Sequence, residues 1–139
     1  MPATLESRPV LDVDEHGKYI VWRSGAFFIA VDDPANAAFI TLWSTEVRGR
    51  IGYLRLTPGR EFETKGYAVV ADVGILAKYH GKGLGRALYL VASKYQSDRF
   101  TGIASENSSR ANKRQVPRIW RSLGAKQLPC GTFLLSSST

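Results

Sequence analysis

Residues 71–88, with the sequence ADVGILAKYHGKGLGRAL, decide how the rest of the chain is interpreted. An apolar run leads into a basic, glycine-rich loop, and the loop leads into residues whose apolar positions recur with the period of a helix. Where a strand, a glycine loop and a helix follow one another directly, the free backbone N–H groups at the helix N-terminus point outward. The stretch therefore predicts a binding site for an anion such as a phosphate group.

Two common nucleotide-binding loops do not fit this stretch. A P-loop needs Ser or Thr directly after Gly-Lys, whereas Gly83 follows Lys82. A dinucleotide-binding loop of the form G-x-G-x-x-G needs a third glycine where Arg86 or Leu88 stands. The phosphate group is therefore expected to belong to another kind of cofactor.

The run HGKGLG at residues 80–85 resembles the coenzyme A pyrophosphate loop of the GNAT superfamily of acyl-CoA-dependent N-acyltransferases. That loop has the pattern Arg/Gln-x-x-Gly-x-Gly/Ala, and the departure here is His80 at the first position. Residues 73–75 stand where the family pairs strand backbone with the pantetheine arm. Residues 119–125 resemble its second signature, with Trp120 in place of the usual tyrosine. The resemblance extends over roughly residues 66–128.

The resemblance implies acetyl-CoA as the acyl donor. Glycine amides would bind the pyrophosphate, because glycine lets an oxygen come close and tolerates a positive φ. His80 would donate either from its ring or only from its backbone N–H. Asn112 resembles an asparagine that contacts the cofactor arm, and Asn107 is the alternative. The expected cofactor-binding residues are Val73, Gly74, Ile75, His80, Gly81, Lys82, Gly83, Leu84, Gly85, Arg86 and Asn112.

Structural readings of the same residues remain open. The glycine loop is also compatible with a surface turn that carries solvated lysines, and Gly74 with a glycine bulge in a buried strand.

Amine acylation needs a neutral amine, a donor to the thioester carbonyl and an acid or water for the leaving thiolate. Asp72 is the first candidate for the base, because it lies in an otherwise apolar run where a carboxylate is expensive unless paired or functional. Glu106, after the next expected strand, is the second. Either carboxylate could instead pair with an arginine and be structural.

The acid is harder to assign. Trp120 stands where the family commonly has its tyrosine, and an indole N–H has no useful acidity. Tryptophan more commonly has a packing role. The substitutes are Tyr89, Tyr95, Ser122 or water.

Composition narrows the remaining function classes. Cys130 is the single cysteine, which excludes an internal disulfide, and with two histidines there is no recognisable metal site. No apolar run approaches the ~20 residues of a membrane span. We therefore expect a cytoplasmic protein without a metal cofactor and without a membrane partner.

Charge is unevenly distributed along the chain, whose net charge is +7. Acids outnumber bases in residues 1–46, whereas no acid follows Glu106. The basic C-terminal part is compatible with a polyanion such as RNA, with the phosphates of coenzyme A, or with solubility alone.

A single domain over residues 1–139 is expected, with a loosely attached arm at residues 1–17. A helix of about 12 residues should begin at Leu84 and end near Ser97. Further on, either two short helices meet near Val116, or one helix starts with Pro117 in its first turn and stops at Gly124; the second arrangement is favoured. The expected strands are residues 19–23, 26–31, 39–44, 51–56, 67–76, 100–104, 126–128 and 132–135.

These elements predict an α/β (α+β) fold of GNAT type. It has a mixed, mostly antiparallel central sheet, helices on both faces and N-terminal helices that are reduced or missing. The family normally places two helices between its first two strands, where they wall the acceptor pocket, and this sequence has no helical stretch there. We therefore expect an open acceptor side.

The sequence thus predicts an N-acetyltransferase that transfers an acetyl group from acetyl-CoA to a primary amine. An open acceptor side favours a bulky acceptor such as a protein lysine or N-terminus. The alternatives are a toxin that acetylates aminoacyl-tRNA, and a binding protein that kept the fold but lost catalysis.

Overall fold

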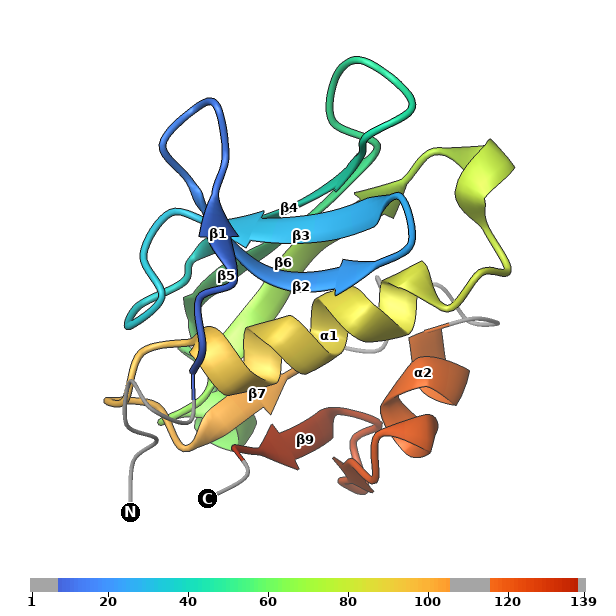
Figure 1. Cartoon of the computed structure of the whole chain (residues 1–139). Helices are drawn as coiled ribbons and strands as arrows, with labels where there is room; N and C mark the ends of the chain where they lie inside the picture. The colour runs from blue at the N-terminus through green and yellow to red at the C-terminus, as the bar shows by residue number, and fades with distance from the viewer. Residues whose placement is uncertain (1–7, 106–115, 138–139) are drawn as a thin grey trace.

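The computed structural model describes residues 8–105 and 116–137 (Figure 1). Its helices are α1 (Leu84–Tyr95) and α2 (Val116–Ser122), with 3-10 turns η2 (Phe62–Thr64) and η3 (Ala77–Tyr79). The strands are β1 (Asp12–Val13), β2 (Tyr19–Ser24), β3 (Phe27–Val31), β4 (Phe39–Ser44), β5 (Gly52–Pro58), β6 (Ala68–Ile75), β7 (Gly102–Ala104), β8 (Lys126–Gln127) and β9 (Phe133–Ser136).

The nine strands of the described residues form one sheet in the order β1-β2-β3-β4-β5-β6-β7-β9-β8. Strands β1 to β6 are an antiparallel meander, because each follows its neighbour through a short connection. Strand β7 is parallel to β6, since α1 carries the chain back across the sheet. The predicted mixed, mostly antiparallel sheet is confirmed.

Helix α1 lies across one face of this sheet (Figure 1) and contacts β4, β5 and β7. Its predicted apolar stripe is buried: Leu84, Leu88, Val91 and Tyr95 all lie in the core. The strands supply the other side of this core from alternate positions, among them Ile29, Leu42 and Leu54. Helix α2 adds Trp120 to the same core and lies beside the N-terminal end of α1.

The expected loss of the N-terminal helices agrees with the structure. Within residues 8–83, the only helical segments are the 3-10 turns η2 and η3. The face of β3 to β6 turned away from α1 is therefore not covered by a helix from the described part of the chain.

The N-terminal arm is tied down more firmly than the sequence suggested. Only residues 8–17 of it are described, and there β1 pairs with β2. Arg8 is buried, donates from Nε to the Lys94 carbonyl at 3.0 Å and pairs with Asp98. Tyr95 donates its hydroxyl to the Pro9 carbonyl at 2.6 Å. A loose arm was the wrong expectation for these residues, because these contacts depend on tertiary neighbours about 85 residues away.

Candidate functional site

The glycine loop joins β6 to α1 through η3, as the sequence predicted. Gly81 and Gly83 both have φ +77°, and Gly83 is the left-handed N-cap of α1. Within the described residues, the backbone N–H groups of residues 81–86 have no hydrogen-bond acceptor; the first helical bond runs from the Ala87 N–H to the Gly83 carbonyl. These six free donors at a helix N-terminus suit an anion.

His80 is engaged inside the chain by both of its donors. Its ring donates from Nε2 to the Ile75 carbonyl at 2.8 Å, and its backbone N–H donates to the Ala77 carbonyl at 3.1 Å. The imidazole therefore links the loop to the end of β6 through a hydrogen bond. In this conformation the donors free to bind an anion begin at Gly81.

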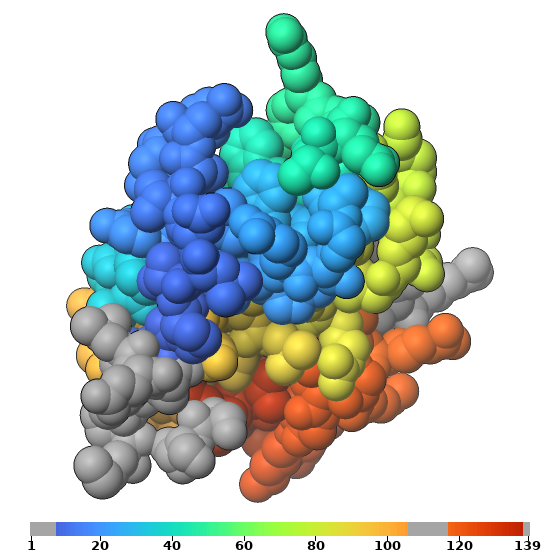
Figure 2. Space-filling model, viewed as in Figure 1, coloured from blue at the N-terminus to red at the C-terminus, as the bar shows by residue number. Residues whose placement is uncertain are grey.

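The side chains of the loop divide into charged and packing groups. Lys82 and Arg86 are exposed, and the Arg86 Nε donates to the Ser122 hydroxyl at 3.3 Å, which links α1 to α2. Leu84 is buried, so only its backbone N–H faces the site. In the space-filling view, the yellow-green segment that leads into the loop lies at the surface (Figure 2).

Gly85 allows the first turn of α1 to approach its neighbours. A Cβ on this residue would lie 3.2 Å from Ile119 Cδ1 and 3.7 Å from Ile75 Cδ1. The first of these contacts is tighter than normal packing, so the glycine sets how closely α1 sits on α2. The loop and residues 119–125 are therefore neighbours in space.

The edge of β6 opens beside this loop. Strands β6 and β7 pair only at Ala68 with Ile103 and at Val69 with Ala104. Ser105, the next residue, turns to β9 and bonds Phe133 at 2.9 Å through its N–H. A register shift between β5 and β6 leaves Ala71 as an extra residue, and such a bulge bends a strand. The remaining part of β6, which includes residues 73–75, has no pairing to β7.

Gly74 lies opposite Tyr53 of β5. A Cβ at Gly74 would lie 3.0 Å from the Tyr53 ring, so glycine at this position gives the ring room. The bulge considered at Gly74 lies at Ala71 instead, because the register shift falls three residues earlier.

Asp72 is exposed, whereas its apolar neighbours in the sequence suggested a buried carboxylate. Strand β6 alternates, and Asp72 points to the face opposite α1, where it accepts a hydrogen bond of 2.9 Å from the Tyr53 hydroxyl. The hydrogen bond to Asp72 raises the pKa of the Tyr53 hydroxyl above its usual value, so this hydroxyl stays protonated at neutral pH. Tyr53 was not among the residues predicted from the sequence, because only the β5–β6 register brings it to Asp72.

The candidates for the acid have different surroundings. Trp120 is fully buried, 5.0 Å from Tyr89 and stacked on Phe133. Tyr95 is bound at the far end of α1, about 16 Å along the helix from Leu84. Ser122 donates to the Ile119 carbonyl at 2.8 Å. None of these contacts brings a hydroxyl to Asp72, whereas Tyr53 lies beside it.

Tyr89 leads to a prediction about alkaline stability. Burial raises the pKa of its hydroxyl from 10.0 to about 12. Because the unfolded chain ionises this group first, the stabilisation it provides is complete below pH 10 and is lost as the pH rises to about 12. Two pKa units correspond to about 2–3 kcal/mol. The free energy of unfolding, measured with urea, should therefore fall less between about pH 9 and pH 12 in Tyr89→Phe than in the unaltered chain. An equal fall in the two proteins would contradict this prediction.

Two expected site residues cannot be placed. Glu106 and Asn112, together with the alternative Asn107, lie outside the described residues. In the described ranges there is no cluster of three or more His, Cys, Asp or Glu side chains that could hold a metal ion. No helix in those ranges is long and apolar enough to cross a membrane.

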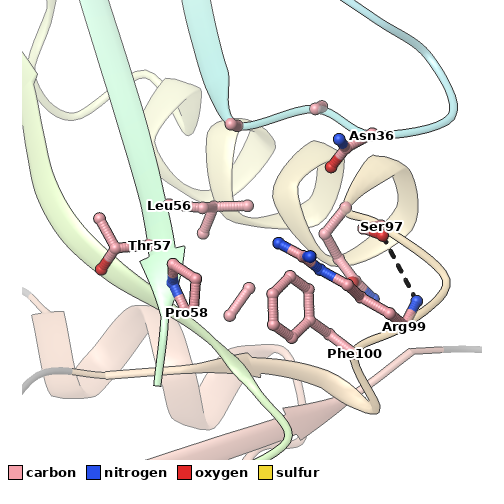
Figure 3. Close-up of a pocket in the computed structure, with 11 residues that line it drawn as sticks. Asn36, Leu56, Thr57, Pro58, Ser97, Arg99 and Phe100 are labelled. Atoms are coloured by element: carbon pink, nitrogen blue, oxygen red, sulfur yellow. Dashed lines mark hydrogen bonds between the residues drawn. The ribbon is translucent and has the colours of Figure 1, made fainter. Parts of the chain in front are cut away.

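A hollow lies at the other end of α1 from the glycine loop (Figure 3). This cavity of about 120 Å³ is lined by Leu56, Pro58, Gln96 and Phe100 among others, and Arg99 stacks on the Phe100 ring at 4.9 Å. Gln96 caps the C-terminus of α1, about 20 Å along the helix from the glycine loop. The cavity is thus separate from the candidate anion site.

A mixed sheet whose parallel pair opens beside a glycine loop at a helix N-terminus is the arrangement expected of acyl-CoA-dependent N-acyltransferases. The sequence matches the model of the Acetyltransferase (GNAT) family over residues 3–111, more than half of the chain, so the chain belongs to this family. The match includes the N-terminal half, where the sequence shows little of the family pattern, and ends before residues 119–125. No curated protein matches the sequence. Family membership supports acyl transfer from acyl-CoA as the general activity.

Proposed function

We propose that this protein transfers an acetyl group from acetyl-CoA directly to a primary amine. The observation that carries the proposal is the set of six backbone N–H groups at residues 81–86 that have no acceptor within residues 8–105 and 116–137, next to the part of β6 that does not pair with β7. These amides, with Lys82 and Arg86, would bind the pyrophosphate, and the backbone of residues 73–75 would bind the pantetheine amides, as an added strand does.

Calorimetric titration with acetyl-CoA and with coenzyme A that lacks its 3′-phosphate tests this assignment. Micromolar binding of acetyl-CoA is expected, with weaker binding when the phosphate is missing, because a basic loop gains from each anionic group. A folded protein that produces no heat with either compound would mean that the loop is only a turn.

In the proposed reaction the amine nitrogen attacks the thioester carbonyl carbon, the C–S bond breaks, and the thiolate takes up a proton from water. Asp72 would remove the amine proton, directly or through water. The Tyr53 hydroxyl holds that carboxylate from one side and keeps its own proton. Glu106 remains the alternative base.

Replacing Asp72 with Asn is expected to lower kcat about 100-fold, the lower end of the range for general-base catalysis. Asp72 is exposed, and its removal leaves no buried group unpaired, so affinity for acetyl-CoA should stay unchanged. Thiol release with a panel of amines measures kcat, and Glu63→Gln on η2 is the matched control. A fully active Asp72→Asn variant would transfer the role to Glu106 or to water.

The acceptor is proposed to be macromolecular, because the helices that normally wall the acceptor side are missing from residues 8–83. A protein lysine or N-terminus and the amine of an aminoacyl-tRNA are the two classes considered. A cytoplasmic location is part of the proposal, because the single Cys130 and the use of acetyl-CoA agree with a reducing compartment.

A further inference from the structure

Four aromatic side chains lie on the sheet face turned away from α1. Phe28, Phe39, Trp43 and Tyr53 alternate along β3, β4 and β5 with core residues that pack under α1. Phe28 and Trp43 stack with ring centroids 6.5 Å apart, and Phe39 and Tyr53 stack at 6.1 Å. All four are half-buried, because no helix of the described chain covers them. We refer to these four side chains as the aromatic face.

Arginines surround the aromatic face. The Arg50 guanidinium lies 5.3 Å from the Phe39 ring centroid and 5.2 Å from that of Tyr53. Arg55 is exposed opposite Phe39, and Arg23 is exposed opposite Phe28. Cations held over stacked rings form a surface that is flat and positively charged.

The contacts of the described residues place other charged groups on or beside this face. Asp72 is opposite Arg55 and bound by Tyr53, and Asp12 lies 3.9 Å from Arg23. His16 packs on Trp43 with ring centroids 5.7 Å apart, and Glu15 lies 3.5 Å from that histidine. Each of these carboxylates already faces a cationic, histidine or hydroxyl partner, whereas Arg50 faces only rings among the contacts described.

This combination favours one class of partner. Half-exposed aromatic rings with interleaved arginines are what single-stranded nucleic acids require, since bases stack on the rings and phosphates pair with the guanidinium groups. A lysine-rich peptide that approached Asp72 would meet the like charges of Arg50 and Arg55. From β3 to β6 the face spans about 14 Å, enough for roughly two to three stacked bases.

We propose that the aromatic face binds single-stranded nucleic acid, and that the amine acceptor is carried on that nucleic acid. The second half rests on the proposed function, because Asp72 stands at the β6 edge of the same face and would meet the amine there. Binding itself does not depend on acyl transfer, since no residue of the glycine loop takes part in it.

Fluorescence anisotropy with a fluorescein-labelled RNA of ~12 nucleotides, and with DNA of the same sequence, tests the binding half. Binding to the unaltered chain should weaken with salt, as phosphate contacts require. Arg50→Glu should weaken it about tenfold and lower the salt slope by about 0.7. Trp43→Ala should weaken it at least about fivefold through lost stacking. Lys94→Glu makes the same charge change on α1 and should weaken binding less than about twofold.

Equal losses of nucleic-acid affinity in Arg50→Glu and Lys94→Glu would show general charge attraction and would overturn the proposal. An unaltered chain that does not bind the RNA or the DNA at low salt would also overturn it. Arg50 lies in an exposed turn, so its variant should fold even if Trp43→Ala does not. Calorimetry with acetyl-CoA on the same variants distinguishes nucleic-acid binding from the proposed acyl transfer, because Arg50→Glu should leave the affinity for acetyl-CoA unchanged. Acetylation of an aminoacyl-tRNA should fall in Arg50→Glu, and equal acetylation of it by the unaltered chain and by Arg50→Glu would contradict an acceptor carried on nucleic acid.

Discussion

Affinity for acetyl-CoA is expected to fall by at least ~1000-fold when Gly83 is replaced with Asp. Gly83 has φ +77°, a conformation that costs a residue with a Cβ about 1–2 kcal/mol. The new carboxylate would also stand at the N-terminus of α1, among the backbone N–H groups of residues 81–86. Repulsion between unit charges at 4 Å near a protein surface is about 4 kcal/mol, so the combined effect exceeds three orders of magnitude. Calorimetric titration measures the loss directly.

Gly66→Asp provides the matched control for this experiment. Gly66 has φ +86°, has open space where its Cβ would stand, and lies before the other end of β6. It therefore introduces similar backbone strain and the same charge far from the loop. If both variants bind acetyl-CoA equally well, the loop does not hold the cofactor; if both lose binding, the effect is general strain.

The glycine loop and α1 could be predicted because their determinants are local. Glycine spacing and a stripe of four apolar residues define a turn and a helix face without knowledge of any distant contact. The same holds for the second helix, since Pro117 lies in the first turn of α2 and Gly124, with φ +81°, follows its end. Hydrophobic and aromatic runs likewise located β2 to β6 within one or two residues.

What depends on register could not be predicted. Tyr53 and Asp72 are 19 residues apart, and their contact follows from the bulge at Ala71, which the sequence does not mark. The same bulge accompanies the outward position of Asp72, which an apolar sequence context had suggested was buried. His80 is similar, because its bond to the Ile75 carbonyl requires the η3 turn to bring the ring back over the end of β6.

The hydrogen bond between Asp72 and Tyr53 makes these two residues, and not Trp120, the ones to substitute in a test of catalysis. From the sequence, position 120 was where the family commonly has its tyrosine, and Tyr89, Tyr95, Ser122 or water were the substitutes for Trp120. In the structure the hydroxyl beside the proposed base is that of Tyr53 on β5, which binds the Asp72 carboxylate at the edge of the aromatic face. A substitution of Trp120 is then expected to change the stability of the fold, which thermal unfolding measures.

Trp120→Ala is expected to destabilise the fold by about 3–5 kcal/mol, the usual cost of truncating a fully buried aromatic side chain. The indole is enclosed by Tyr89 at 5.0 Å and by Phe133 at 6.1 Å, so its loss leaves a cavity between α1, α2 and β9. For a chain of this size the loss corresponds to a melting temperature lower by roughly 10–20 °C. Thermal unfolding followed by circular dichroism measures it.

Trp120→Phe separates packing from chemistry at this position. Among the described residues, the indole Nε1 has no hydrogen-bond acceptor although it is buried, and such a group costs about 1–3 kcal/mol. Phenylalanine removes that cost and loses part of the packed volume, so the two effects oppose each other and the variant should unfold within about 1 kcal/mol of the unaltered chain. Its acyl transfer rate should then be unchanged. A stable Trp120→Phe variant with a strongly reduced kcat would instead mean that the indole N–H takes part in the reaction, despite its burial.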